Sequence, residues 1–240
     1  MAGKIRVTVW NEFRHENKPG KVQEVYPKGI HEAIAEYLRV QPDMEVRTAT
    51  LAEPSHGLTD EVLANTDVLT WWGHLAHGDV DDKIAAKVKE RVLQGMGLIV
   101  LHSAHMAKPF LALMGTTGAL KWREDGKKEI LWVTKPGHPI LKDIKDHFVL
   151  EQEEMYGEHF DIPDPDEVIL ISWFGGGEVF RSGCTFQRGQ GKIFYFRPGH
   201  ETFPTYYDKN VRSVIANGIR WAAPCGAPPA TYWHHKSILD

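Results

Sequence analysis

The chain has 240 residues, 42% of them hydrophobic and 25% charged, and a formal net charge of −4. This composition is that of a globular protein with a sizeable core, and the charge excludes broad attraction to nucleic acid or anionic membranes. Two cysteines, Cys184 and Cys225, exclude a disulfide framework and a CxxC metal motif. The amino terminus lacks the apolar core of a signal peptide, and no apolar run reaches membrane-spanning length, so we expect a cytoplasmic protein.

The first half of the chain predicts alternating strands and helices. Short apolar or alternating runs indicate strands, and apolar residues at helical spacing indicate helices between them. This order is typical of a parallel sheet with right-handed crossovers. The expected strands are residues 4–11, 46–51, 67–72 and 97–101, and the expected helices are residues 30–38, 59–63 and 81–93.

The second half adds antiparallel strands. Glycines within Arg188-Gly189-Gln190-Gly191 predict a hairpin between residues 185–187 and 192–196. Further strands are expected at 128–134 and 168–174, an extended stretch at 148–159, and helices at 108–114 and 210–222. We therefore expect one α/β domain over residues 1–223, followed by an extended arm over 224–240. The arm carries Tyr232 and Trp233, and together with the eight tryptophans it favours a homo-oligomer.

Histidines cluster at predicted strand ends, where open α/β sheets place their binding crevice. Two His-x-x-His pairs follow expected strands, and two other histidines lie beside carboxylates. Imidazoles suit a divalent transition metal, zinc above all, although single histidines are more often surface or capping residues. The histidines expected to bind metal are His74, His77, His102, His105, His159 and His200.

Carboxylates provide candidates for proton transfer. Glu153, Glu154 and Glu158 flank Tyr156, and Glu201 follows a histidine directly. Clustered carboxylates raise one another's pKa and suit general acid–base work. The alternative is a solvated face of charged residues.

Ser103 follows the strand at 97–101 and is a candidate nucleophile at a strand-to-helix elbow. The glycines of a Gly-x-Ser-x-Gly elbow are replaced here by Leu101 and His105. The loop at 11–20 lacks a phosphate-binding glycine pattern, so we expect no nucleotide cofactor. Its residues Asn11, Glu12 and His15 either approach the crevice or form a solvated loop.

Several stretches together make the chain similar to a known family. They are Trp71-Trp72-Gly73-His74, Gly97 to Ser103, His138-Pro139-Ile140, Glu153 to Tyr156, Gly189 to Tyr195, Pro198-Gly199-His200-Glu201 and Ile219 to Ala222. The chain resembles the trehalose-utilisation (ThuA-like) family of the class I glutamine amidotransferase-like superfamily. The resemblance implies a flavodoxin-like α/β sheet, rich in parallel strands, with helices on both faces.

The resemblance also bears on chemistry. Glutamine amidotransferases need a cysteine at the elbow, where this chain has His102-Ser103, so glutaminase activity is not expected. The family implies action on a disaccharide or its keto form, together with a partner oxidoreductase. Its recurrent polar positions correspond to His74, His102, Ser103, Glu154, Tyr156, His200 and Glu201; His77, His105, His159, Glu178 and Arg181 come from this sequence alone.

Two functions follow as hypotheses. In the first, the chain is a hydrolase- or lyase-type enzyme acting on a sugar. Glu154, Tyr156, Glu201 and Ser103 are then the catalytic candidates, and Trp72, Glu178, Arg181 and Glu12 the sugar-binding ones. In the second, the chain is a non-catalytic sugar-binding or sensing module. A resemblance in fold does not choose between them.

Overall fold

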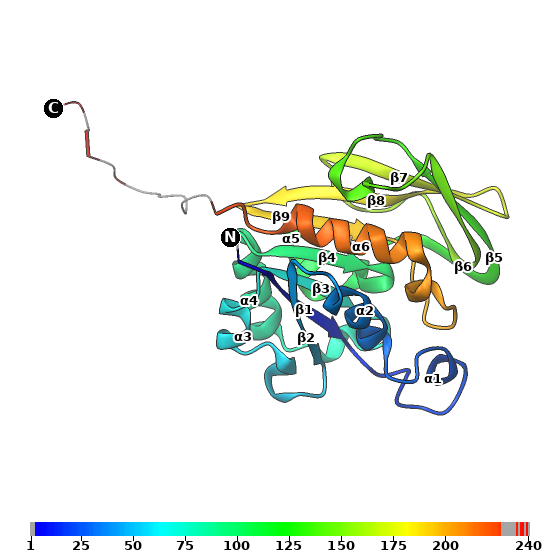
Figure 1. The fold of residues 1–240 in the computed structure, drawn as a ribbon, viewed down its shortest axis with the longest axis horizontal. Coiled ribbons are helices and arrows are strands. Elements are labelled where there is room, and N and C mark those ends of the chain that lie inside the picture. The colour runs from blue at the N-terminus through cyan, green and yellow to red at the C-terminus, as the bar shows by residue number, and fades with distance from the viewer. Residues whose placement is uncertain (1–2, 227–233, 235, 238, 240) are drawn as a thin grey trace.

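A computed structural model describes residues 3–226, 234, 236, 237 and 239. A nine-stranded sheet organises the chain, with strand order β2-β1-β3-β4-β9-β8-β7-β5-β6 (Figure 1). The strands are β1 (Ile5–Asn11), β2 (Met44–Thr50), β3 (Val68–Trp72), β4 (Gly97–Leu101), β5 (Lys121–Val133), β6 (His147–Gly157), β7 (Glu167–Phe174), β8 (Val179–Arg188) and β9 (Gly191–Phe196). The helices are α1 (Lys21–Val25), α2 (Ile30–Arg39), α3 (Asp60–Ala64), α4 (Asp82–Leu93), α5 (Lys108–Met114) and α6 (Lys209–Ala222).

The parallel half of the sheet confirms the pattern read from the first half of the chain. Strands β2, β1, β3, β4 and β9 are parallel neighbours. Every residue of β3 and β4 is buried, as expected for central strands covered on both faces. The carboxyl ends of these strands therefore meet at one edge of the sheet.

Helices cover both faces of this half (Figure 1). Leu38 of α2 and Ile215 of α6 pack with Ile99 in one apolar cluster. Val88 of α4 and Phe110 of α5 belong to the cluster on the other face. Two apolar layers thus enclose β4, and polar side chains follow at its carboxyl end.

The antiparallel half begins at the predicted hairpin. Strands β8 and β9 pair antiparallel, while β9 also pairs in parallel with β4, so β9 joins the two halves. Gly189 turns the hairpin with φ +57°, and a Cβ there would lie 2.5 Å from the main-chain oxygen of Leu93. This position accepts only glycine.

Strand β5 is longer than the sequence pattern indicates. The expected strand at 128–134 starts instead at Lys121, because residues 121–127 pair with the last residues of β6. These residues are mostly charged and carry no apolar alternation, so periodicity did not reveal them. This extension matters because it brings β5 side chains to the carboxyl edge of the sheet.

The expected contacts of Tyr232 and Trp233 lie outside the described residues. Helix α6 ends at Ala222, close to the predicted end of the domain. Within the described part of the chain, no helix combines the length and apolar character needed to cross a membrane.

Candidate functional site

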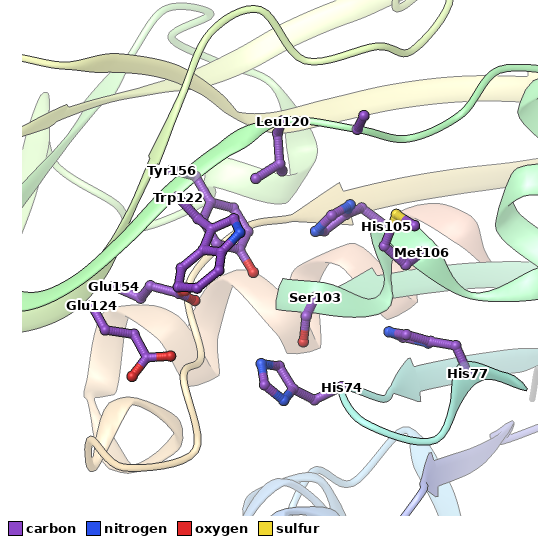
Figure 2. Close-up of a pocket in the computed structure, with 11 residues that line it drawn as sticks. His74, His77, Ser103, His105, Met106, Leu120, Trp122, Glu124, Glu154 and Tyr156 are labelled. Atoms are coloured by element: carbon purple, nitrogen blue, oxygen red, sulfur yellow. The ribbon is translucent and has the colours of Figure 1, made fainter. Parts of the chain in front are cut away.

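A pocket of about 400 Å³ opens at the carboxyl ends of β3 and β4. Figure 2 shows side chains from the loops after these strands facing side chains from β5 and β6. His74 and Ser103 contribute from the first side, and Trp122, Glu154 and Tyr156 from the second. The site therefore lies where the crevice of an open α/β sheet is expected.

His102 occupies the elbow directly after β4. Its φ of 51° lies in the left-handed region, which non-glycine residues seldom adopt. The Nδ1 atom lies 2.9 Å from the carbonyl oxygen of Arg197 and must donate, because a carbonyl only accepts. The Nε2 atom then faces Glu154 Oε2 at 3.1 Å and the Tyr156 hydroxyl at 3.5 Å.

Burial sets the protonation of these three groups. It lowers the pKa of His102 to about 3 and raises the pKa of Glu154 above its usual range. It also raises the pKa of Tyr156 well above 10, so the phenol stays protonated. A neutral imidazole and an ionised carboxylate would set two lone pairs against each other at 3.1 Å. The contact therefore requires one proton between the two atoms, and burial disfavours the charged form of both groups.

A buried arginine, Arg197, interacts with both His102 and Glu154. The guanidinium of Arg197 donates to the main-chain carbonyl of Glu154 at 2.6 Å and forms ion pairs with Glu129 and Glu153. Glu153 in turn accepts from the Gly199 N–H at 3.2 Å. Arg197, Glu129 and Glu153 are completely buried, so the network anchors both β6 and the loop after β9.

A second cluster lies beside the pocket. His15 Nε2 is 3.1 Å from His74 Nδ1 and 3.6 Å from Glu201 Oε1. The Glu12 carboxylate accepts the main-chain N–H groups of His74, Leu75 and Ala76 at 2.7, 2.8 and 2.9 Å. Glu12 was expected to bind sugar, but the structure makes it the support of the loop that carries His74.

Within residues 3–226, the structure gives Ser103 no histidine as a base. Its hydroxyl lines the pocket and donates to the Gly73 carbonyl at 2.9 Å. The elbow apex is His102, one residue earlier, whose Nε2 faces Glu154. Ser103 therefore lacks the hydrogen-bonded base that a nucleophilic serine needs.

Three other predicted histidines stand apart from both clusters. His77 and His105 line the pocket, and burial lowers their pKa values to about 4 and about 3. His105 Nδ1 donates to the Gly118 carbonyl at 2.7 Å. His159 is exposed after the end of β6. The sixth, His200, is buried next to Glu201, with its Nε2 3.7 Å from Glu201 Oε2.

The predicted sugar-binding residues lie outside the pocket lining. Trp72 is fully buried and donates its indole N–H to the Gly199 carbonyl at 3.1 Å. Glu178 pairs with Arg123 at 2.6 Å, and Arg181 pairs with Glu158 at 2.8 Å. Each of these side chains therefore already interacts with another residue of the protein.

Sequence reasoning missed Trp122 and Glu124 in the pocket and Arg197 behind it. Trp122 is 62% exposed and stands within a charged stretch, which is the signal that marks it in the sequence. Arg197 directly follows the apolar run of β9, and nothing in the neighbouring sequence indicates that this arginine is buried.

Comparison with known proteins adds the family. A sequence profile described as trehalose utilisation (ThuA) matches residues 6–222. The chain belongs to the ThuA family. This confirms the resemblance seen in its motifs. No curated protein gives a significant match to the chain.

Solved structures with a similar fold support the fold of this ThuA family member. A ThuA-like protein from Parabacteroides merdae aligns with a TM-score of 0.69 at 14% identity, covering 94% of this chain and 93% of that one. The PurLQS structure from Thermotoga maritima aligns with a TM-score of 0.56 at 14% identity, covering 91% of this chain and 99% of that one. A GMP synthase protein from Thermoplasma acidophilum aligns with a TM-score of 0.52 at 12% identity, covering 92% of this chain and 94% of that one. These similarities confirm the amidotransferase-like fold.

Proposed function

We propose that this ThuA family member processes a disaccharide, or a related glycoside oxidised to a ketone at one ring carbon. The observation that carries the proposal is the 3.1 Å contact between Glu154 Oε2 and His102 Nε2 at the wall of the pocket. The two groups share one movable proton and are both buried, and Glu154 also lines the pocket. Such a pair suits proton transfer with a bound substrate.

Trp122 supplies the sugar-facing surface. Its ring is 62% exposed although it lies at the pocket, directly across from Tyr156 in the β5–β6 register (Figure 2). An exposed indole presents a large apolar face with little conformational freedom, which suits the C–H face of a sugar ring. Leu120 and Met106 extend the apolar part of the lining. The pocket thus combines an apolar wall with a few polar groups, as small-molecule sites do.

The chemistry that we propose is elimination followed by hydration. Glu154 passes its proton to His102 Nε2 and takes a proton from the carbon next to the ketone. The electron pair of that C–H bond moves onto the ketone and forms an enolate. The enolate then re-forms the C=O bond, a carbon–carbon double bond forms as the glycosidic C–O bond breaks, and the leaving oxygen receives a proton from the pair. Water then adds across the double bond, so the sum is hydrolysis. Tyr156 donates a hydrogen bond to the enolate oxygen.

The substrate requires an earlier oxidation, so an oxidoreductase acting on the same sugar must precede this protein. Of the two carboxylates considered for proton transfer, Glu154 lines the pocket, whereas Glu201 is not part of the lining and lies 4.0 Å from His74 Nδ1. We therefore assign the proton transfer to Glu154.

The test compares turnover and binding of oxidised and unmodified disaccharides. Glu154→Gln should lower kcat by about 10²–10⁴-fold with little change in KM. Glu151→Gln, on the same strand but exposed, is the matched control. Trp122→Ala should raise KM, whereas Trp132→Ala, also on β5 and 45% exposed, should not.

Two results would overturn the enzymatic proposal. Wild-type protein that binds the sugar through Trp122 without turning it over is a binding module. A Glu154→Gln variant that keeps full turnover excludes the Glu154–His102 pair as the catalytic group.

A further inference from the structure

Three side chains from three separate loops converge beside the pocket. His15 comes from the loop after β1, His74 from the loop after β3, and Glu201 from the loop after β9. One nitrogen or oxygen atom from each lies within 4.8 Å of the other two. The separations are 3.1 Å between the imidazoles and 3.6 and 4.0 Å from them to Glu201 Oε1.

These atoms match the donor set of a transition metal. Two imidazole nitrogens and one carboxylate oxygen are ligands that zinc accepts readily. A tetrahedral zinc ion with bonds of about 2.0–2.1 Å holds neighbouring ligand atoms about 3.3 Å apart. The observed separations bracket that value. A hydrogen bond between the two rings is the alternative account of the 3.1 Å contact.

An independent observation favours a cation. Glu201 Oε2 and His200 Nε2 are buried, lie 3.7 Å apart and have no hydrogen-bond partner among the described residues. The side chains of Glu201 and His200 are only 6% and 3% exposed. A buried carboxylate without a compensating charge or hydrogen bond is costly. A hydrogen bond between His15 and His74 leaves the Glu201 carboxylate uncompensated, whereas a cation bound to that carboxylate compensates it. The unpaired His200 Nε2 belongs to the second group of donors, Glu124, Glu154 and His200.

The surroundings hold the cluster in position. Glu12 fixes the main chain of the His74 loop through three N–H groups. These bonds limit the movement of the loop that carries His74. His74 also lines the pocket, so an ion held by the cluster would lie at the pocket wall.

We propose that His15 Nε2, His74 Nδ1 and the Glu201 carboxylate bind one divalent transition-metal ion, zinc by preference. The assignment replaces most of the ligands expected from the sequence, because it keeps His74 and adds His15 and Glu201. It goes beyond the proposed sugar chemistry and does not depend on it. A second group of donors, Glu124, Glu154 and His200, is the competing location.

The experiment measures metal content and affinity rather than activity. Untagged protein is stripped with a chelator and titrated with zinc, and with cobalt(II), whose visible absorption reports imidazole ligation. Wild-type protein should bind about one ion per chain. His15→Ala and Glu201→Gln should each reduce binding to a small fraction of that. Melting temperature confirms folding, and Glu201→Gln, which keeps the side-chain volume, decides the result if His15→Ala does not fold.

The control is His77→Ala, which alters a pocket histidine outside both groups of donors and should leave metal binding unchanged. Wild-type protein that binds no zinc overturns the proposal, even if it turns over sugar. Binding that survives His15→Ala but disappears in Glu124→Gln moves the ion to the competing location and also overturns it. Metal bound at the proposed site without any sugar turnover supports this proposal and leaves the proposed function to fail separately.

Discussion

The carbonyl of Arg197 and the imidazole of His102 form a 2.9 Å hydrogen bond that decides which nitrogen of His102 faces Glu154. The same arginine donates from its guanidinium to the Glu154 carbonyl at 2.6 Å. One residue therefore orients both members of the proton-sharing pair. Its own position is set by buried ion pairs with Glu129 and Glu153.

Replacing His102 by asparagine should separate its structural role from its chemical role. The Asn side chain can still donate to the Arg197 carbonyl, and asparagine tolerates the φ of 51° better than most residues. We expect His102→Asn to fold normally and to lose turnover. His102→Ala should in addition lose about 1–3 kcal/mol of stability, because the buried carbonyl is left unpaired. Turnover and urea unfolding check this, and equal instability of both variants would contradict it.

Arg197→Met should be severely destabilising. The substitution leaves Glu129 and Glu153 buried without their counter-charge, which costs about 3–5 kcal/mol. Adding Glu129→Gln to Arg197→Met should recover part of that loss. The free energy of unfolding of the single and double variants tests the coupling when it is measured at pH 8, above the pKa of about 7 of Glu129. Strict additivity of the two changes would refute the network.

Glu129→Gln alone should change the pH dependence of stability. Burial raises the pKa of Glu129 to about 7, whereas an unfolded glutamate titrates near 4.5. Between these values the folded state keeps a proton that the unfolded state has lost, so this group makes stability fall as pH rises. In the Gln variant, this decrease in stability with rising pH should be absent. Unfolding free energies at pH 5 and pH 7 provide the comparison, and identical slopes in both proteins would contradict it.

His105→Asn should act in the opposite direction. Burial lowers the pKa of His105 to about 3, so below its ordinary pKa of 6.5 only the unfolded state binds the extra proton. Stability is therefore lost as pH falls from 6.5, by about 1.4 kcal/mol per pH unit for this group. The Asn side chain keeps a donor for the Gly118 carbonyl but does not titrate. Acid unfolding curves should show a shallower slope for the variant.

Glu12→Gln should weaken metal binding at the His15–His74–Glu201 cluster. The carboxylate accepts three main-chain N–H groups of the His74 loop, and a neutral amide with one oxygen cannot satisfy all of them. Loss of such a supporting group costs about 10–100-fold in metal affinity. Zinc titration measures the change. A lower melting temperature with unchanged affinity would make Glu12 a purely structural residue.

Patterns within a few residues were sufficient for much of the fold. Apolar runs and helical spacing located β1, β3, β4 and helices α2, α4 and α6, because periodicity reports directly which face of an element is buried. The same patterns located the strand ends after which His74 and His102 lie. The family motifs pointed to Glu154, Tyr156 and Glu201. The charged residues 121–127 were not recognised as part of a strand, because their pairing depends on the distant β6.

Which side chains meet was decided by the tertiary structure alone. Trp72, expected to bind sugar, is completely buried, whereas Trp122 is 62% exposed at the pocket. His15 joins His74 only because β1 and β3 are parallel neighbours, and Glu201 joins them because β9 returns to the same sheet. Strand order and register set these contacts. The sequence by itself therefore determined the elements and the edge where the site lies, and long-range pairing determined the members of the site.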